Sequence, residues 1–235
     1  MCGIVGYAGP REALPILLDA MARVEYRGYD SCGVAVQGAG GLQVAKAVVG
    51  VEALRGRLPP WRGRLGIGHT RWATAGVPTR ENAHPHLDCG GRLALVHNGD
   101  IENYLALRQG LEGRGHTFSS QTDTEVIAHL IEEQDRGDLV EAVARAVAAL
   151  EGSYALLVAA ADAPYLVAAR RESPLVVGLG EGEVLVASDL PALLGRASHA
   201  LYLEDGDIAR LAPEGVEVWN NGEAVERAAH PISWR

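Results

Sequence analysis

The first residues of the chain, Cys2-Gly-Ile-Val-Gly-Tyr-Ala8, form an apolar run that is typical of a buried β-strand. Apolar residues then recur at helical spacing at Leu14, Leu17, Leu18 and Met21, which predicts that a helix follows this strand. A reactive side chain at position 2 would therefore be held by a rigid element at the very start of the chain. The fold and the chemistry predicted for this protein both begin with that segment.

Short strands are predicted on both sides of a mainly helical middle. The earlier strands cover 33–37, 42–48, 66–71 and 93–97, and the later ones cover 154–160, 165–169, 175–178, 184–187, 201–203, 207–211 and 216–219. Between them, Thr122-Asp-Thr-Glu125 has the form of a capping box before an apolar stripe, and a second helix is predicted over 139–150. Strands, then helices, then strands indicate one layered α+β domain. The last stretch, 223–235, loses periodicity and is expected to leave the domain.

Composition excludes several classes of protein. Of the 235 residues, 48% are apolar and 22% charged, so the chain can bury a sizeable core without disulfides. The net charge is −9, from 21 basic and 30 acidic residues, and the basic residues do not cluster, which argues against nucleic-acid binding. No apolar run is long enough to span a membrane. Three cysteines without a CxxC motif predict no disulfide framework, and we expect a soluble, cytoplasmic protein.

Cys2 is the candidate nucleophile. If Met1 is removed, this residue carries both a thiol and a free α-amine. The α-amine has an ordinary pKa of about 7.7–8.0, so at neutral pH it can act as the base for its own thiol without help from a histidine. A cysteine at position 2 could also be an accident of sequence. Its place at the start of a buried strand favours the chemical interpretation.

Arg71 and Asp123 together suit a free amino acid as ligand. Arg71 ends a predicted buried strand, and its guanidinium is a forked, permanently charged partner for a carboxylate. Asp123 lies at the start of a predicted helix and could bind an ammonium group. Taken singly, Arg71 would be a surface arginine and Asp123 a carboxylate that caps a helix, which is the commoner role. As a pair, they would bind both charges of an amino acid.

Asn98 and Gly99 directly follow the predicted strand 93–97. Asn-Gly is the strongest short signal for a tight turn. The same two residues could form an oxyanion hole, in which the Asn98 amide and the Gly99 backbone N–H point at one developing negative charge. Glycine permits the close backbone approach that such a hole needs. The sequence alone leaves both interpretations open.

The segment Asn82-Ala-His-Pro-His-Leu-Asp-Cys89 contains side chains that could bind zinc. His84, His86 and Cys89 lack the paired second half of a zinc motif, so a zinc-binding structural domain is only an alternative. We expect these side chains to order a loop, and Cys32 and Cys89 to be small buried hydrophobic residues. No metal ion and no organic cofactor is expected.

Six sequence blocks occur in a fixed order along the chain. They are Cys2-Gly-Ile-Val-Gly6, Glu25-Tyr-Arg-Gly-Tyr-Asp-Ser31, His69-Thr-Arg-Trp-Ala-Thr74, Asn82-Ala-His-Pro-His86, His97-Asn-Gly-Asp-Ile-Glu-Asn103 and Thr122-Asp-Thr-Glu-Val126. Together they resemble the glutaminase domain of the glucosamine-6-phosphate synthases, the isomerising glutamine–fructose-6-phosphate aminotransferases. The second block separates this family from the asparagine synthetases and the purine-pathway amidotransferase. The resemblance covers essentially residues 1–235, as one class II glutamine amidotransferase domain.

The resemblance implies the N-terminal nucleophile hydrolase fold, an α+β four-layer αββα sandwich with two mainly antiparallel sheets. It also implies that Cys2 is the nucleophile with its α-amine as base, and that Asn98 and Gly99 form the oxyanion hole. The implied reaction is hydrolysis of L-glutamine to glutamate, which releases ammonia.

The glutamine-binding residues are implied in the same way. Arg71 would hold the α-carboxylate of glutamine and Asp123 its α-ammonium group. Trp72 and Thr74 would belong to a mobile loop that closes over the pocket. His86 is the candidate residue that supports the closed form.

The chain also departs from the family pattern. Many relatives have a histidine where this chain has Ala75, so we expect a change in loop closure. Full-length relatives are homodimers that continue into two sugar isomerase domains, which bind fructose 6-phosphate and receive the ammonia. The chain stops at Arg235, near the expected linker, which suggests an excised domain. Two alternatives stay open: a domain serving another acceptor, such as a nucleotide or aspartate, and a non-catalytic glutamine-binding module if Met1 is retained.

Overall fold

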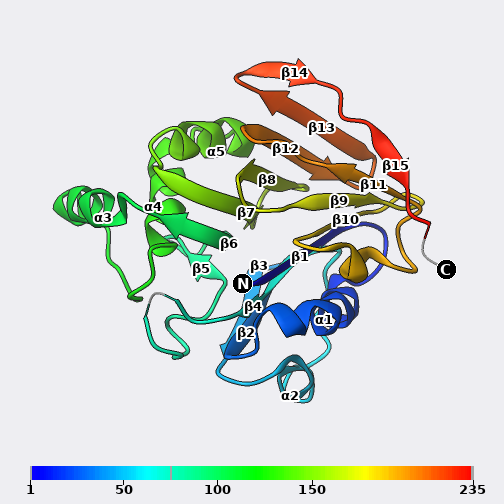
Figure 1. The fold of residues 1–235 in the computed structure, drawn as a ribbon. Coiled ribbons are helices and arrows are strands. Elements are labelled where there is room, and N and C mark those ends of the chain that lie inside the picture. Colours follow the sequence, from blue (N-terminus) through cyan, green and yellow to red (C-terminus); the bar gives the residue numbers. More distant parts are fainter. Residues whose placement is uncertain (1, 75, 234–235) are drawn as a thin grey trace.

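The fold places two β-sheets face to face between two layers of helices (Figure 1). It is seen in a computed structural model that describes residues 2–74 and 76–233. Met1, Ala75 and the last two residues lie outside these ranges, and so does the expectation placed on Ala75.

Within the described residues, the strands form an eight-stranded sheet A and a seven-stranded sheet B, in which paired strands run antiparallel. Sheet A has the spatial order β15 (Ala229–Pro231), β11 (His199–Tyr202), β9 (Val176–Leu179), β10 (Val184–Ala187), β1 (Gly3–Ala8), β4 (Leu65–Arg71), β2 (Ser31–Gly38) and β3 (Gly41–Ala47). Sheet B has the order β14 (Glu223–Val225), β13 (Gly215–Asn220), β12 (Asp207–Ala212), β8 (Leu166–Arg171), β7 (Gly152–Ala160), β6 (Leu93–Ile101) and β5 (His86–Leu87).

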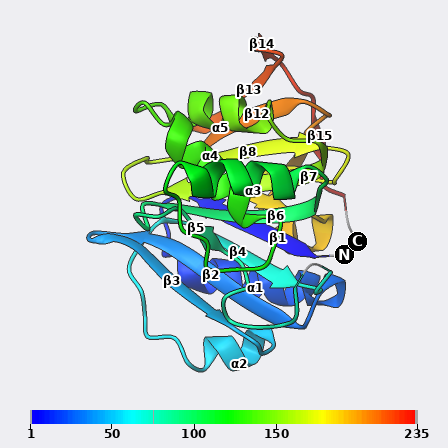
Figure 2. The ribbon, with the colours of Figure 1, turned by 90° about the vertical axis from the view of Figure 1, so that its left-hand side faces the viewer.

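Helices cover the outer face of each sheet, as the turned view in Figure 2 also shows. Sheet A is covered by α1 (Ala13–Val24) and α2 (Val51–Arg55), and sheet B by α4 (Glu125–Gln134) and α5 (Leu139–Val147), with α3 (Tyr104–Gly113) packed beside α4. Two 3₁₀ turns complete these elements: η1 (Glu25–Arg27) follows α1, and η2 (Leu190–Leu193) connects β10 to β11 in sheet A. Three hydrophobic cores fill the spaces between the four layers. This is the αββα sandwich that the resemblance implies.

Strand alternation explains why the central strands are apolar throughout. In β1, Ile4 and Ala8 point into the core between the two sheets, whereas Val5 and Tyr7 point into the core beneath α1. All four side chains are at most 1% exposed. A strand covered on both faces has no position for a solvated side chain, so the opening segment reads as a continuous apolar run.

Most predicted elements are confirmed within a few residues, with differences where sheet pairing overrides a local signal. The strand predicted over 93–97 continues through Asn98 and Gly99, so the turn interpretation of Asn-Gly is wrong. Its pairing with β7 extends to Ile101 opposite Gly152, which keeps the backbone extended. The segment after residue 222, expected to be irregular, forms β14 and β15, and β15 pairs with β11 at the edge of sheet A.

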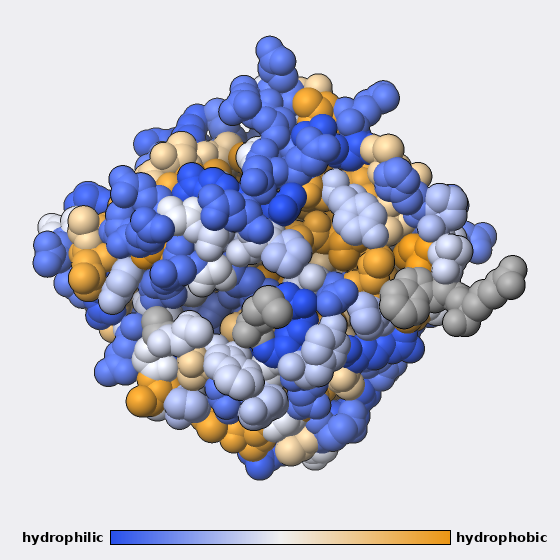
Figure 3. All heavy atoms as spheres, in the orientation of Figure 1, coloured by the Kyte–Doolittle hydropathy of each residue, from blue (hydrophilic) through white to orange (hydrophobic). Residues whose placement is uncertain are grey.

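The molecular surface is mainly polar. Figure 3 shows hydrophilic residues over most of one face, with smaller apolar areas among them. In the parts of the chain that the structure describes, no helix is long and apolar enough to cross a membrane.

Leu157 tests the core between the sheets. It is fully buried in β7 and belongs to that core. Leu157→Ala is expected to lower the free energy of unfolding by about 2–5 kcal/mol, measured by urea denaturation, because a cavity remains. Leu105→Ala is the control, since Leu105 on α3 is 60% exposed, and its effect should stay within about 0.5 kcal/mol. Equal losses in both variants would contradict this placement of the core.

Candidate active site

A small pocket lies where the ends of β1 and β4 in sheet A meet β6 of sheet B. Its volume is about 30 Å³, room for about one or two water molecules. Its lining consists of Cys2, Arg71, Trp72, Thr74, His84, His97, Asn98, Gly99, Thr122, Asp123 and Thr124. The pocket therefore brings together seven of the eight residues predicted for the site, all except His86.

The Cys2 thiol is held against the backbone of Trp72. It donates to the Trp72 carbonyl oxygen at 3.5 Å and accepts from the Trp72 N–H at 3.3 Å. Burial raises the pKa of the thiol above its ordinary value, and the Trp72 hydrogen bond and the charges of Arg71 and Arg27 offset only part of that rise. The thiol is therefore protonated at neutral pH, so it needs a base before it can react.

His69 fixes the orientation of the Asn98 side chain. His69 Nε2 lies 3.0 Å from Asn98 Oδ1 and 3.1 Å from the carbonyl oxygen of His97. Because both partners are acceptors, Nε2 carries the proton and donates. Asn98 Nδ2 then faces Cys2 and donates to its carbonyl oxygen at 2.9 Å. An amide nitrogen has two hydrogens, so one is left for a ligand in the pocket.

Four buried histidines pack next to the pocket: His69, His84, His86 and His97. The rings of His69 and His84 stack at 4.0 Å, and His84 meets the edge of His86 at 4.7 Å. Burial lowers the pKa of His69 to about 3 and lowers the pKa of the other three, so all four are neutral at pH 7. Sequence reasoning missed His69, His84 and His97, although each lies inside one of the six blocks.

Gly99 cannot be replaced without strain. Its φ is +132°, and a Cβ atom here would lie 2.1 Å from the carbonyl oxygen of Ser153 in β7. Only glycine tolerates both conditions. No side chain therefore separates the Gly99 backbone from the pocket that it lines.

Arg71 and Asp123 are the charged residues of the pocket lining, and both are buried. Arg71 Nη2 donates to the carbonyl oxygen of Gly76 at 3.2 Å. Asp123 Oδ2 accepts from the backbone N–H of Ile101 at 2.9 Å. Burial lowers the pKa of Arg71, and the charge of Asp123 acts against that shift. The pocket thus presents one cation and one anion away from bulk water.

The capping box predicted at 122–125 is wrong. Helix α4 begins at Glu125, and the side chain of Thr124 makes no capping hydrogen bond. The buried carboxylate of Glu125 instead accepts from the backbone N–H groups of Ser119 and Ser120, at 2.8 and 2.7 Å. Ser120 is buried, so its N–H needs a partner, and both N–H groups lie in the loop before the helix.

His86 lies behind the pocket and not in its lining. Its Nε2 is 3.1 Å from the hydroxyl oxygen of Thr122, which does line the pocket. His86 therefore acts on the site through Thr122, the neighbour of Asp123 in the chain.

Residues 28–30 hold the segment that follows Arg71. A Cβ atom on Gly28 would lie 2.6 Å from the backbone of Arg71 and Trp72, so glycine permits the close approach. The Asp30 N–H donates to the Arg71 carbonyl oxygen at 2.9 Å, and Asp30 Oδ2 accepts from the Ala73 N–H at 2.9 Å. From the sequence alone, the block 25–31 served only to distinguish families. The contacts of Gly28 and Asp30 explain why these two residue types are needed here.

Arg27 extends this support to Cys2. Its Nε donates to the Cys2 carbonyl oxygen at 3.1 Å, and its Nη1 pairs with Asp189 at 3.0 Å. The carbonyl group of Cys2 therefore accepts from two side chains, Arg27 and Asn98.

The two remaining cysteines, Cys32 and Cys89, differ in burial. Cys32 is buried as predicted, and burial raises its pKa to about 12. The prediction that Cys89 is buried is wrong, because β5 ends at Leu87 and Cys89 lies beyond it in an exposed position. Its sulfur is 3.4 Å from His116 Nδ1 and 3.5 Å from His129 Nδ1.

The zinc alternative built on His84, His86 and Cys89 is not assembled in the described part of the chain. His84 and His86 pack with His69 near the pocket, whereas Cys89 gathers with other side chains. Proximity in sequence did not bring these three residues together.

Comparison with known families decides the classification. Residues 69–195, more than half of the chain, match the family described as "Glutamine amidotransferase domain". The chain belongs to this family. The matched region of the glutamine amidotransferase domain includes Arg71, Asn98, Gly99 and Asp123, and Cys2 precedes it.

Two similar relatives are named glutamine–fructose-6-phosphate aminotransferase (isomerizing). The domain is 55% identical to the protein of that name from Thermus thermophilus and 52% identical to that from Symbiobacterium thermophilum. In both comparisons the match covers 100% of this chain and 39% of the relative. The chain therefore spans about two fifths of the length of these relatives.

Solved structures of purine enzymes share the fold. The glutamine phosphoribosylpyrophosphate amidotransferase of B. subtilis, complexed with ADP and GMP, matches with a TM-score of 0.81 at 28% identity. A structure described as the allosteric regulatory enzyme of purine biosynthesis matches with a TM-score of 0.81 at 30% identity. Each match covers 93% of this chain and 49% of the other. The glutamine amidotransferase domain thus has the N-terminal nucleophile hydrolase fold, as predicted.

Gly99→Ala is expected to lower the free energy of unfolding by about 2–5 kcal/mol, because two costs are summed: the strain of a side chain at positive φ and the clash of its Cβ with Ser153. Gly182→Ala is the matched control, since Gly182 has φ +66° and no atom near its missing Cβ. It should cost about 1–2 kcal/mol, from the backbone conformation alone. Urea denaturation measures both, and a control that loses as much as Gly99→Ala would contradict the clash.

Proposed function

We propose that this chain is the glutaminase part of an isomerising glutamine–fructose-6-phosphate aminotransferase, and that residues 1–235 form its class II glutamine amidotransferase domain. The observation that carries the proposal is one pocket that contains a thiol, an oriented amide, a positive-φ glycine and two buried opposite charges. Relatives of that name, matched over the whole chain at 52% and 55% identity, support the choice.

L-Glutamine is the proposed substrate of this pocket. Arg71 binds its α-carboxylate and Asp123 binds its α-ammonium group. Buried charges need partners of opposite sign, and a zwitterion supplies one for each. The Ile101 N–H donates to Oδ2 of Asp123, and the Thr124 hydroxyl donates to Oδ1 at 3.4 Å. A carboxylate oxygen can accept more than one hydrogen bond, so Oδ1 can also accept from the substrate ammonium.

Acyl transfer begins at Cys2 once Met1 is removed. The free α-amine takes the thiol proton, and the sulfur bonds to the side-chain amide carbon of glutamine. Asn98 Nδ2 and the Gly99 N–H donate to the resulting oxyanion. The protonated α-amine then returns its proton to the departing nitrogen, the C–N bond breaks, and ammonia leaves. Water next attacks the γ-glutamyl thioester and the C–S bond breaks, which yields glutamate and restores the thiol.

Trp72 and Thr74 belong to a loop that moves when glutamine binds. A volume of about 30 Å³ is too small for glutamine, and both residues line that volume. Trp72 is also 43% exposed, so it can leave its position at little cost in buried area. His86 supports the closed arrangement through its contact with Thr122.

The ammonia acceptor is proposed from the relatives. We propose fructose 6-phosphate, converted to glucosamine 6-phosphate in sugar isomerase domains of a homodimer. The part of the relatives that this chain does not match has room for those domains. Cys2, Cys32 and Cys89 are free thiols, which supports a reducing, cytoplasmic location.

Labelling with 6-diazo-5-oxonorleucine, an electrophilic glutamine mimic, tests the proposed nucleophile. Protein without Met1 is expected to gain one adduct on Cys2, located by peptide mapping, and to lose glutaminase activity. Excess glutamine should protect it. Cys2→Ala should lose both labelling and activity, whereas the control Cys32→Ala should keep both. An unlabelled, inactive protein that lacks Met1 would overturn the proposal and favour a glutamine-binding module.

The pKa of Cys2 predicts how its alkylation depends on pH. Only the thiolate reacts with iodoacetamide, and burial places the thiol pKa above its ordinary value of 9.0. In a chain that retains Met1, the rate at Cys2 should rise about tenfold per pH unit between about pH 7 and 9 without levelling off. Cys32, with a pKa of about 12, is the internal control and should react far more slowly. The alkylation rate is measured by peptide mapping with mass spectrometry at a series of times. A plateau of the Cys2 rate at lower pH would contradict the raised pKa.

A further inference from the structure

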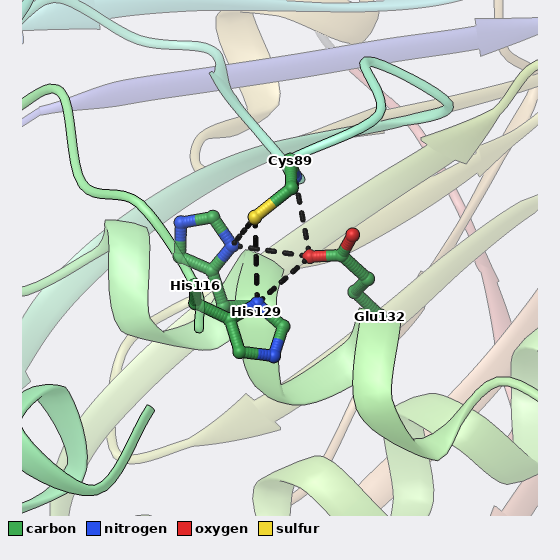
Figure 4. A group of neighbouring side chains, drawn as sticks. All are labelled: Cys89, His116, His129 and Glu132. Atoms are coloured by element: carbon green, nitrogen blue, oxygen red, sulfur yellow. Dashed lines mark hydrogen bonds and ion pairs between the residues drawn. The ribbon is translucent and has the colours of Figure 1, made fainter. Parts of the chain in front are cut away.

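Four side chains from three separate segments converge at α4, away from the glutamine pocket (Figure 4). Cys89 follows β5, His116 lies in the connection from α3 to α4, and His129 and Glu132 lie one turn apart on α4. Each offers one ligand atom, and these atoms all lie within 4.8 Å of one another. The set of one sulfur, two imidazole nitrogens and one carboxylate oxygen is typical of zinc sites.

Four of the six distances between these atoms are close to those of a tetrahedron around one zinc ion. Zn–S bonds of about 2.3 Å and Zn–N or Zn–O bonds of about 2.0–2.2 Å place S and N about 3.5 Å apart, and N and O about 3.4 Å apart. The Cys89 sulfur lies 3.4 Å from His116 Nδ1 and 3.5 Å from His129 Nδ1. Glu132 Oε2 lies 3.1 Å from His116 Nδ1 and 3.2 Å from His129 Nδ1.

Hydrogen bonds alone cannot account for all of these contacts. Each Nδ1 atom faces both the Cys89 sulfur and Glu132 Oε2, yet it carries at most one hydrogen. The same Glu132 oxygen also accepts from the Cys89 backbone N–H at 3.2 Å. A cation at the centre would satisfy the lone pairs of all four atoms together.

A carboxylate stands behind His116. Its Nε2 lies 3.3 Å from Glu133 Oε1, and Glu133 is held by Arg114. His129 Nε2 lies 4.0 Å from Glu125, beyond hydrogen-bonding distance, so only the His116 ring has this support. A carboxylate on the outer nitrogen of a metal-binding histidine fixes the ring and makes the inner nitrogen a better ligand.

Access from solvent is available. A surface hollow of about 380 Å³ reaches both Cys89 and His129. Cys89 itself is exposed, so a metal ion can arrive without unfolding of the core.

We propose that Cys89, His116, His129 and Glu132 form a tetrahedral Zn²⁺ site, separate from the glutamine pocket. The Cys89 thiol loses its proton to solvent as the Zn–S bond forms. With four protein ligands, no position is left for a substrate, so the ion is structural. It ties the loop after β5 and the α3–α4 connection to α4, the helix that directly follows Asp123 and Thr124.

A reactive cysteine is the competing interpretation of the same cluster. A thiol needs only one imidazole as its base, with a carboxylate on the opposite ring nitrogen. Here each of the two imidazoles points its Nδ1 at both the sulfur and the carboxylate. That arrangement surrounds a point between the side chains, which favours a metal ion.

Zinc and cobalt binding to the full chain tests the site. The parent carries Cys2→Ala, so that the active-site thiol does not compete, and the unmodified chain is measured beside it. We expect one equivalent of Zn²⁺ per chain by mass spectrometry under native conditions and by competition with a chromogenic chelator. Co²⁺ should show tetrahedral ligand-field bands and thiolate-to-metal charge transfer.

Variants of the proposed ligands and of a neighbouring residue test which side chains bind the ion. Cys89→Ser and His116→Asn should each weaken Zn²⁺ binding by more than about 100-fold, and Glu133→Gln by about 10–100-fold. Cys32→Ala removes a thiol elsewhere in the chain, so this control should bind Zn²⁺ like the parent. Circular dichroism confirms that each variant is folded.

Two results would overturn the proposal. One is Zn²⁺ bound equally well by the parent and by Cys89→Ser. The other is no Zn²⁺ binding together with fast alkylation of Cys89 that depends on His129, which would assign a reactive thiol instead. Neither result bears on labelling of Cys2, so this test is independent of the proposed glutaminase activity.

Discussion

The position of Cys2 depends on a hydrogen bond between the two sheets. Asn98, in β6 of sheet B, donates to the carbonyl oxygen of Cys2, which directly precedes β1 of sheet A. Arg27 donates to the same oxygen, so the peptide group after Cys2 is fixed from two directions. The thiol keeps its position relative to Asn98 and Gly99 only while the two sheets keep their spacing. The three hydrophobic cores and the outer helices maintain that spacing.

Burial determines which charges a ligand meets in the pocket. It lowers the pKa of His69, His84 and His97, so these rings contribute shape and hydrogen bonds but no positive charge at neutral pH. Arg71 and Asp123 then dominate the electrostatics. A singly charged ligand would leave one of them without a partner in a site shielded from water, which is costly. The proposed selectivity for a free amino acid thus depends on histidines that stay uncharged at neutral pH.

The sequence predicted the α+β class and most central strands, because strands buried on both faces leave unbroken apolar runs. It missed β14 and β15, whose exposed residues carry no such pattern. Cys2 and Arg71 were found because each lies at or next to a strand end, and Asn98 because it directly follows the apolar run 93–97. The residues that hold these side chains in place were not predicted, because His69 and Asn98 are 29 positions apart and in opposite sheets. Cys89 and His129 are 40 positions apart, and no spacing rule joins them.

The small volume of the pocket has a kinetic consequence. Room for about one or two water molecules is less than the proposed substrate glutamine needs. In the proposed reaction, each turnover therefore starts with a separation of the pocket walls, and the frequency of that separation sets an upper limit on the consumption of glutamine. The intrinsic reactivity of the thiol cannot raise this limit.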